Sequence, residues 1–266
     1  MSAAELDDAA DRFGVTWPDF IAAAHAVAVA RLGGHREIVV GIPLMNRIGP
    51  AALAPTSVVN VLPMHVGVTP GRPLGEFVAD VAARLHRVRR HGRFRAEELA
   101  RLTRRVTGDA PLVGAELNLK VFDQPSRIGD LALRWHTLAE GPVDDLGLSV
   151  YRVDGALTWT ATTPGGVPAD LLTDLRPDDA DDVARGGGVG PRDDRQPQAD
   201  GPAHAAGALV TDLVQRMLLA APGDRLGSLG AAGRHLTARP AEARPEPVRS
   251  SAEVPATAPE LFAAVV

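Results

Sequence analysis

The sequence predicts an α+β domain with a mixed sheet, helices on one face of that sheet, and a largely disordered C-terminal tail. Two apolar helical stripes come first, within residues 2–34. Two β-branched runs, further helices and a series of strands follow up to residue 163. This order is typical of a sheet with its helices segregated to one side. Residues 177–205 then hold almost no apolar side chains, a composition typical of disorder.

Composition limits the class of protein. The chain has 266 residues, no cysteine and a net charge of −5. The lack of cysteine excludes disulfides and cysteine-ligated zinc, and it predicts a reducing, cytoplasmic location. The negative charge argues against a nucleic-acid partner. No apolar run approaches the roughly 18 residues of a membrane span, and the acidic start differs from a secretory signal, so we expect no membrane partner.

The first helix is predicted over residues 2–13, where apolar side chains recur at helical spacing before Gly14. A second helix begins after Thr16, because Thr16-Trp-Pro-Asp19 resembles a capping box with proline in the first turn, where its missing N–H does no harm. The broad apolar stripe of this helix reaches Leu32, and two glycines end it.

Two apolar runs with β-branched residues predict the first strands. Residues 38–42 show no polar alternation, which predicts a strand buried on both faces. Residues 58–68 include Asn60 and His65 within an apolar run. A buried asparagine without hydrogen-bond partners costs about 1–3 kcal/mol. Asn60 therefore either brackets a loop through backbone groups or faces a cavity.

Later elements follow from the same patterns. Apolar spacing predicts helices over residues 73–91 and 94–106 and a short one within 169–175. Alternation and β-branched residues predict strands over residues 112–122, 131–138, 146–153 and 156–161, the last two joined by an Asp154-Gly155 hairpin turn. Adjacent apolar rows predict an amphipathic helix that begins near residue 206 and docks back on the domain.

Several segments resemble one family. Gly41-Ile-Pro-Leu-Met-Asn-Arg47, followed by Val59-Asn-Val-Leu-Pro-Met64, resembles the GxPxxxR and NTLPL region of condensation domains in nonribosomal peptide synthetases. Gly141-Pro-Val-Asp-Asp-Leu146 is similar to the GPVEDL turn of the family. The family joins two carrier-tethered substrates by an amide bond. Its fold resembles chloramphenicol acetyltransferase, with two lobes and a tunnel between them.

The resemblance implies a division of the chain. Residues 1–176 would form the C-terminal lobe of a condensation domain, and residues 177–205 a disordered insertion. Residues 206–230 would form the amphipathic helix and the start of a linker. Residues 231–266 would continue that linker to a point near the start of an absent adenylation domain.

The catalytic HHxxxDG motif of the family belongs to its first lobe, and no His-His pair occurs in these 266 residues. The resemblance therefore implies a partial condensation domain that contributes a tunnel wall but no catalytic histidine, so we assign no catalytic residue and leave independent enzyme activity open. One alternative is a non-catalytic carrier-docking module or the remnant of a truncated synthetase gene. Another is a different acyltransferase of the superfamily, which would also need a His-xxx-Asp motif.

Three positions are candidate site residues. Arg47 resembles the arginine that pairs with the aspartate of HHxxxDG across the lobe junction, since an Arg fork suits a carboxylate. The alternative is an exposed loop arginine. Asn60 and Asn118 are candidates for the substrate tunnel, where each would hydrogen-bond a pantetheine amide. The alternative is that each satisfies neighbouring backbone groups.

The basic run of the third predicted helix suggests a partner. Arg84, Arg87 and Arg90 are candidates for contact with an acidic carrier protein or its phosphopantetheine phosphate. The alternative is a solvated helix face. We expect no metal and no cofactor bound directly, with phosphopantetheine carried by the partner. Further expected partners are a separate chain with the first lobe and, through the exposed inter-lobe face, a second copy of this chain.

Overall fold

The computed structural model describes residues 3–53, 55–107, 112–124, 127–133, 145–153, 156–163, 169–171 and 202–229. The helices are α1 (Ala3–Arg12), α2 (Trp17–Gly33), α3 (Leu74–Arg90), α4 (Ala96–Thr107) and α5 (Pro202–Leu219), with 3-10 turns η1 (Gly49–Leu53) and η3 (Leu226–Leu229). The strands are β1 (Glu37–Leu44), β2 (Asn60–Gly67), β3 (Ala115–Gln124), β4 (Arg127–Ile128), β5 (Leu131–Ala132), β6 (Gly147–Val153), β7 (Ala156–Thr162) and β8 (Ala169–Leu171).

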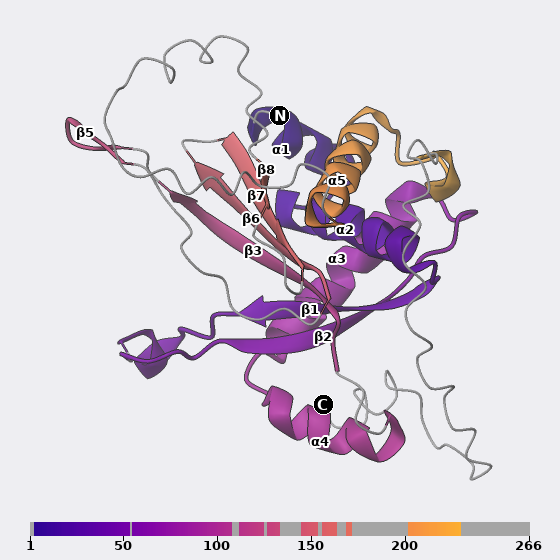
Figure 1. Ribbon diagram of the computed structural model, residues 1–266. Helices are drawn as coiled ribbons and strands as arrows, with labels where there is room; N and C mark the ends of the chain where they lie inside the picture. Colours follow the sequence, from indigo (N-terminus) through magenta and orange to yellow (C-terminus); the bar gives the residue numbers. More distant parts are fainter. Residues whose placement is uncertain are drawn as a thin grey trace.

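Among the described residues the main sheet has six strands in the order β2-β1-β3-β6-β7-β8. Strand β1 is antiparallel to β2 and parallel to β3, and β3 is parallel to β6. Strand β7 is antiparallel to both β6 and β8. The predicted mixed sheet is therefore confirmed. Strands β4 and β5 form a separate small hairpin that projects from the sheet (Figure 1).

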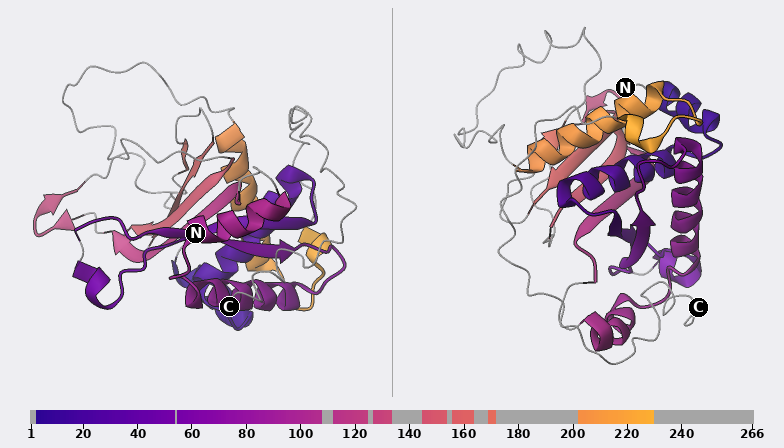
Figure 2. Two further views of the ribbon diagram at one scale, coloured as in Figure 1. Left: turned by 90° about the horizontal axis from the view of Figure 1, so that it is seen from below. Right: turned by 90° about the vertical axis from the view of Figure 1, so that its right-hand side faces the viewer.

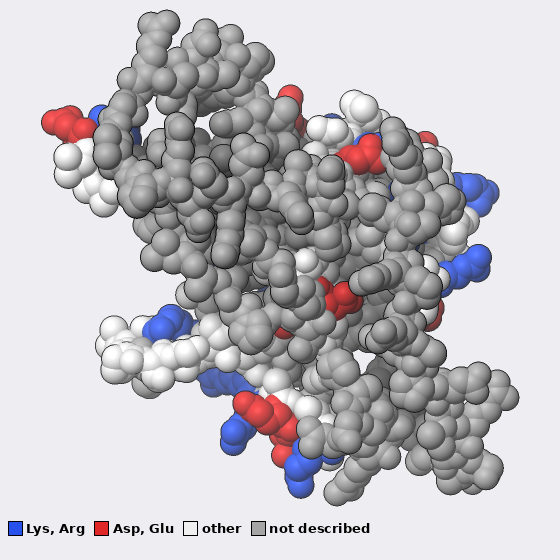
Figure 3. All heavy atoms as spheres, viewed as in Figure 1, with Lys and Arg blue, Asp and Glu red and all other residues white. Residues whose placement is uncertain are grey.

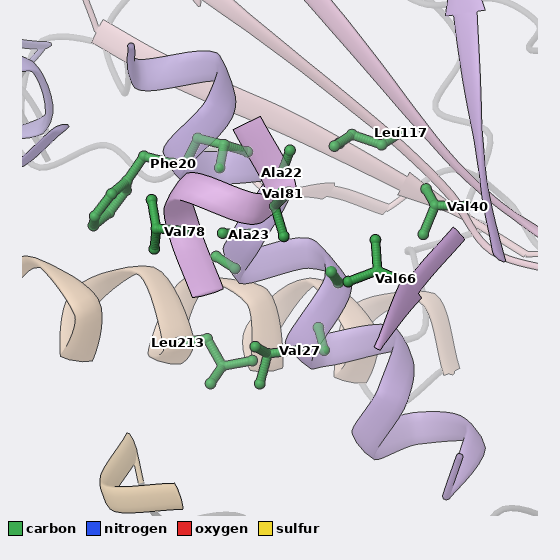
Figure 4. Packing of buried hydrophobic residues seen from close by; sticks show 14 of the residues in the cluster. Phe20, Ala22, Ala23, Val27, Val40, Val66, Val78, Val81, Leu117 and Leu213 are labelled. Carbon is green, nitrogen blue, oxygen red and sulfur yellow. The ribbon is translucent and has the colours of Figure 1, made fainter. Parts of the chain in front are cut away.

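One face of the sheet carries a helical layer formed by α1, α2, α3 and α5 (Figures 1 and 2). Helix α2 lies at its centre and contacts both α3 and α5. Side chains from α2, α3 and α5 interdigitate with side chains from β1, β2 and β3, as the close view shows (Figure 4). Helix α5 therefore shares one core with the N-terminal elements, which confirms that the predicted amphipathic helix docks back on them.

Local signals explain why α2 begins and ends where it does. Thr16 and Asp19 form the predicted capping box, in which the Asp19 carboxylate accepts hydrogen bonds from the Thr16 backbone N–H and hydroxyl. Gly34 ends the helix with φ of 66°, a left-handed conformation that favours glycine.

None of the described helices has by itself the length and hydropathy of a membrane span. Helices α1 and α2, which meet at a bend of 83°, reach that length and hydropathy only when they are counted together.

Three predictions about local structure are wrong. The first strand is buried on one face only, because Ile38, Val40 and Ile42 pack under the helices while Val39 is 38% exposed. Part of the predicted short helix, Ala169–Leu171, is instead strand β8, paired with β7. Helix α5 begins at Pro202, not near residue 206. The predicted disorder before Pro202, the 154–155 turn and most of the predicted 131–138 strand lie outside the described residues.

Candidate functional site: a polar sheet face, a bracketed turn and a basic helix

The sheet face opposite the helices carries a row of polar side chains across three strands. Asn118 on β3 is in register with Ser149 on β6, which is in register with Thr160 on β7. Their strand neighbours Leu117 and Trp159 are fully buried in the core under the helices. Because successive side chains on a strand point to opposite faces, the three polar side chains point away from the helical layer.

Charged residues flank Asn118 on both sides along β3. Glu116 lies against Gly41 on β1, where a Cβ would stand only 3.0 Å from the Glu116 Cγ atom. Lys120 lies over the ring of Tyr151, with its Nζ atom 5.4 Å from the ring centre. Thr160 is buried, so the accessible groups of this face are the Glu116 carboxylate, the Asn118 amide, the Ser149 hydroxyl and the Lys120 cation. These donors and acceptors suit a ligand with amide and hydroxyl groups.

Asn60 brackets the turn between α3 and α4. Its Nδ2 atom donates to the carbonyl oxygens of Gly92, at 2.8 Å, and of Phe94, at 2.6 Å. Its Oδ1 atom accepts from the backbone N–H of Ala96, the first residue of α4, at 3.1 Å. The sequence left open whether Asn60 binds backbone groups of a loop or faces a cavity, and the structure shows that it binds backbone groups of this turn. Contact of Asn60 with a substrate stays a prediction.

Arg47 lies in residues 45–59, which we call the arm and which project beyond β1 and β2 (Figure 1). The Arg47 side chain is exposed, and its Nη2 atom donates to the carbonyl of Thr56 at 3.0 Å. The arm also exposes large apolar side chains, and Leu53 at its tip is 90% exposed. Arg47 is thus an exposed arginine on a projecting element with exposed apolar side chains.

The three candidate arginines of α3 differ in how they are held. Arg84 is half-buried, donates to the Asp80 carboxylate at 3.0 Å, and donates to the carbonyl of His65 at 3.1 Å. Arg87 and Arg90 are exposed. The three positions therefore do not form one equivalent set: Arg84 is part of the packing between α3 and β2, and the other two present their charge to solvent.

Asp80 is the centre of that packing. Its carboxylate also accepts from Arg72 at 3.0 Å. Burial raises the pKa of Asp80, but the hydrogen bonds from Arg72 and Arg84 outweigh burial and hold its pKa below the usual value. Charge pairs also cover α4, where Glu98 contacts Arg101 at 2.6 Å. Acidic and basic side chains lie together at the lower edge of the view, where α4 lies (Figures 1 and 3).

The histidines of the described residues are dispersed. His25 is fully buried on α2, and burial lowers its pKa to about 4. His65 contacts Glu37 at 2.9 Å on the edge of the sheet, and His86 lies 3.6 Å from Asp19 between α3 and α2. Within the part of the chain that the structure describes, no three His, Asp or Glu side chains converge as metal ligands do.

A sequence model of the family described as Condensation domain matches residues 2–143, more than half of the chain. The chain belongs to the condensation-domain family. The chloramphenicol acetyltransferase-like fold expected for this family agrees with the mixed sheet and its single helical layer.

Curated relatives of this condensation-domain chain are large synthases. It is 40% identical over 139 residues to Enterobactin synthase component F of Escherichia coli (strain K12), which covers 52% of this chain and 11% of that protein. It is 35% identical over 153 residues to the Dimodular nonribosomal peptide synthase of Bacillus subtilis (strain 168), which covers 57% of this chain and 6% of that protein. The chain therefore corresponds to a small part of each.

Solved structures agree on the fold. The first condensation domain of the CDA synthetase superposes with a TM-score of 0.61 at 22% identity, over 86% of this chain and 45% of that one. FmoA3, a nonribosomal peptide synthetase, superposes with a TM-score of 0.60 at 19% identity, over 85% of this chain and 23% of that one. The condensation-domain chain spans less than half the length of these structures.

The structure brings together only some of the predicted site residues. Asn60 begins β2 and pairs with Leu44 at the end of β1, and Arg47 lies in the arm between them. Asn118 lies on β3, separated from β2 by β1. Sequence reasoning did not single out Ser149 and Thr160. Their signal was available in the alternation of polar and apolar residues along β6 and β7.

Proposed function

We propose that this chain provides one lobe of a condensation domain that forms an amide bond between two carrier-bound substrates in nonribosomal peptide synthesis. The match of residues 2–143 to the condensation-domain family carries this proposal. In the proposed reaction the amine of one substrate attacks the thioester carbonyl of the other, an amide bond forms, and the carrier thiol leaves. The chain would line the substrate tunnel, and a second lobe would provide the catalytic histidine.

The second lobe is proposed for two reasons. Superposition on the solved condensation domain uses 45% of that domain, so more than half of it has no counterpart in the match. The 266 residues contain no adjacent pair of histidines. A proton acceptor beside the attacking amine is needed for this reaction, and we assign it to the other lobe.

We assign the tunnel wall to the polar face around Asn118. A pantetheine arm carries amide groups, and an asparagine side chain both donates to and accepts from an amide. The Asn118 side chain is half-buried and points away from the helices, next to Ser149. Asn60 already uses both N–H groups on the α3–α4 turn. Asn118 is therefore the stronger candidate of the two.

We assign the contact with the other lobe to the arm and the β4–β5 hairpin. Both project from the sheet and expose apolar side chains, including Ile48, Leu53, Ile128 and Leu131. An apolar surface of this kind is typical of a covered interface. Arg47 would then pair with the aspartate of the catalytic motif in a planar, two-pronged contact.

The test is complementation. The chain is mixed with a separately produced first lobe of a condensation domain that carries HHxxxDG, and with two carrier proteins loaded with aminoacyl-phosphopantetheine. Mass spectrometry then detects the amide product. We expect product only when both lobes are present. A stable complex of the two lobes on loaded carriers without any amide product would contradict the proposal and favour a docking module.

Arg47→Ala provides the residue-level test. We expect this variant to lower product formation by about tenfold or more, because it leaves the aspartate of the other lobe without its partner. Arg12→Ala is the control, since Arg12 is also exposed and also donates to a backbone carbonyl, that of Leu218, but lies on α1, outside the arm and the β4–β5 hairpin. Equal activity of both variants would remove Arg47 from the lobe junction.

A further inference from the structure

Residues 220–229, which we call the strap, follow α5 and lie along the loop that leads into α3. The backbone N–H groups of Leu74 and Gly75 donate to the strap carbonyls of Asp224, at 2.7 Å, and Pro222, at 2.8 Å. In return, Leu226 N–H donates to Arg72 O at 2.9 Å. The contact joins segments almost 150 residues apart in the sequence.

These hydrogen bonds replace a missing helix cap. The first N–H groups of a helix have no partner inside the helix and usually receive a side-chain cap. The N-cap position of α3 is Pro73, which makes no side-chain cap hydrogen bond. Leu74 and Gly75 are the first two residues of α3. The strap therefore caps α3 with its own backbone carbonyls.

The fit of the strap depends on glycine at two points. A Cβ at Gly75 would lie 2.9 Å from the Cβ atom and 3.1 Å from the carbonyl oxygen of Pro222. A Cβ at Gly227 would lie 3.1 Å from the carbonyl oxygen of Pro70. Glycine is otherwise unfavourable within a helix, so at Gly75 it is explained by the close approach of the strap.

Hydrogen bonds make most of the contact between the strap and the loop before α3. Besides the three given above, Gly227 N–H donates to Pro70 O at 2.7 Å, and Arg225 Nη1 donates to Gly71 O at 2.9 Å. Only Leu226 and Leu229 are buried among its side chains. A cavity of about 210 Å³ remains between the strap and the end of α2, lined by Val27, Arg31, His35, Val68 and Leu226 among others. Ordering ten residues costs conformational entropy that two buried side chains and a few hydrogen bonds offset only narrowly. Such segments open without global unfolding.

We propose that the strap is a two-state clasp that couples the chain after residue 229 to helix α3. When the strap is docked, α3 is capped and the chain leaves the domain at a fixed point beside α2 and α3. When it is undocked, Leu74 and Gly75 lose their acceptors, and the helix that carries Arg87 and Arg90 loosens at its start. Coupling is reciprocal. A force on residue 229 that undocks the strap therefore destabilises the first turn of α3, and a change at that turn alters the stability of the docked strap. The proposal is independent of catalysis.

Amide hydrogen exchange by NMR on the full chain tests the clasp. The amides of Leu74, Gly75, Leu226 and Gly227 sit on the two sides of the contact. We expect their protection factors to agree within about threefold and to be about tenfold or more lower than that of Val150 on β6. Protection equal to that of Val150, or values that differ widely among the four, would overturn the proposal.

Two variants test the coupling from opposite sides. Gly75→Ala should lower the protection of the Leu226 and Gly227 amides by about tenfold, and Leu226→Ala should do the same for Leu74 and Gly75. Gly223→Ala is the matched control, because a Cβ there meets no atom within 4 Å. The proposal is wrong if each variant leaves the protection factors on the opposite side of the contact unchanged. It is also wrong if the protection factor of Val150 falls with them, because the strap would then open only with the whole domain. If either variant fails to fold, the protection factors of Leu74, Gly75, Leu226 and Gly227 relative to Val150 in the unaltered chain still test the proposal.

Discussion

Asn60 holds the carbonyl oxygen of Gly92 at 2.8 Å, across 32 residues of chain. Asn46 donates to the same oxygen, also at 2.8 Å, from a backbone with φ of 50°. Gly92 itself is close to both the strand and the arm, because a Cβ there would lie 2.7 Å from the Asn46 Oδ1 atom. The turn between α3 and α4 is therefore set by side chains at the end of the β1–β2 hairpin.

Replacement of Asn60 by alanine is expected to lower the free energy of unfolding by about 2–3 kcal/mol. The change removes the Asn60 partner of the Phe94 carbonyl and of the Ala96 N–H in a part-buried turn, and it leaves the Gly92 carbonyl with Asn46 as its side-chain donor. Urea unfolding followed by circular dichroism measures the loss. Asn118→Ala is the control, and we expect it to cost less than about 1 kcal/mol. Equal losses at the two asparagines would contradict the bracket.

Burial of His25 predicts a loss of stability in mild acid. The pKa of His25 falls to about 4 in the folded chain, while an unfolded histidine titrates near 6.5. Below about pH 6.5 the unfolded chain binds a proton that the folded chain excludes, so the free energy of unfolding falls by about 1.4 kcal/mol per pH unit down to pH 4. Above about pH 6.5 His25 is neutral in both the folded and the unfolded chain, so it no longer makes the free energy of unfolding depend on pH.

The variant His25→Leu isolates this effect. Its free energy of unfolding should change less between pH 7 and pH 5 than that of the original chain, by about 2 kcal/mol. His35 is exposed, so His35→Leu should keep the original pH dependence. Urea midpoints at both pH values provide the comparison. A His25→Leu variant with an unchanged pH dependence would assign the acid sensitivity to other groups.

Arg152 on β6 joins α1 and α2 to the sheet. Its Nη2 atom lies 2.9 and 3.1 Å from the two carboxylate oxygens of Asp7, and its guanidinium carbon lies 4.9 Å from the ring centre of Trp17. We expect Arg152→Ala to cost about 1–2 kcal/mol, since it removes both an ion pair and a cation–π contact. Thermal unfolding detects the loss.

A double-mutant cycle separates the two contacts of Arg152. The coupling energy between Arg152→Ala and Asp7→Ala should be about 0.5–1 kcal/mol, less than the full cost of Arg152→Ala. The remainder belongs to Trp17 and to packing of the arginine stem. If Asp7→Ala alone were as costly as Arg152→Ala, the contact with Trp17 would contribute nothing to stability.

The basic face of α3 predicts a charge-dependent partner. We expect the double variant Arg87→Glu, Arg90→Glu to weaken binding of an acidic carrier protein by about tenfold at low salt, with a smaller effect at high salt. Surface plasmon resonance at two salt concentrations measures this. Arg101→Glu on α4 is the control. Binding that survives the double variant would favour the alternative of a solvated helix face.

The local parts of the fold were predictable from the sequence because their signals are local. The capping residues Thr16 and Asp19 and the terminating Gly34 determined the extent of α2. The two β-branched runs determined β1 and β2, and their antiparallel pairing follows from the loop between them. Helical and strand periodicity depends on neighbours within a few residues, so each could be recognised without knowledge of the other.

The candidate site was predictable only in part. Sequence motifs indicated Arg47, Asn60 and the arginines of α3, but not which group each one contacts. The structure distinguishes Arg84, held by Asp80, from the exposed Arg87 and Arg90. That difference depends on Asp80 and Arg72 around the same helix, and it has no signature in the spacing of the arginines.

The sequence by itself determined the types of most elements and the family, since both depend on short runs of residues. Tertiary structure alone decided that Val39 is exposed, because none of the described helices packs on that face of the sheet. It also decided that Ala169–Leu171 is a strand, because β7 offers an open edge for pairing. The partners of Asn60 and Gly75 are distant in sequence. Contacts of this kind form only when the chain is folded, and local patterns contain no information about them.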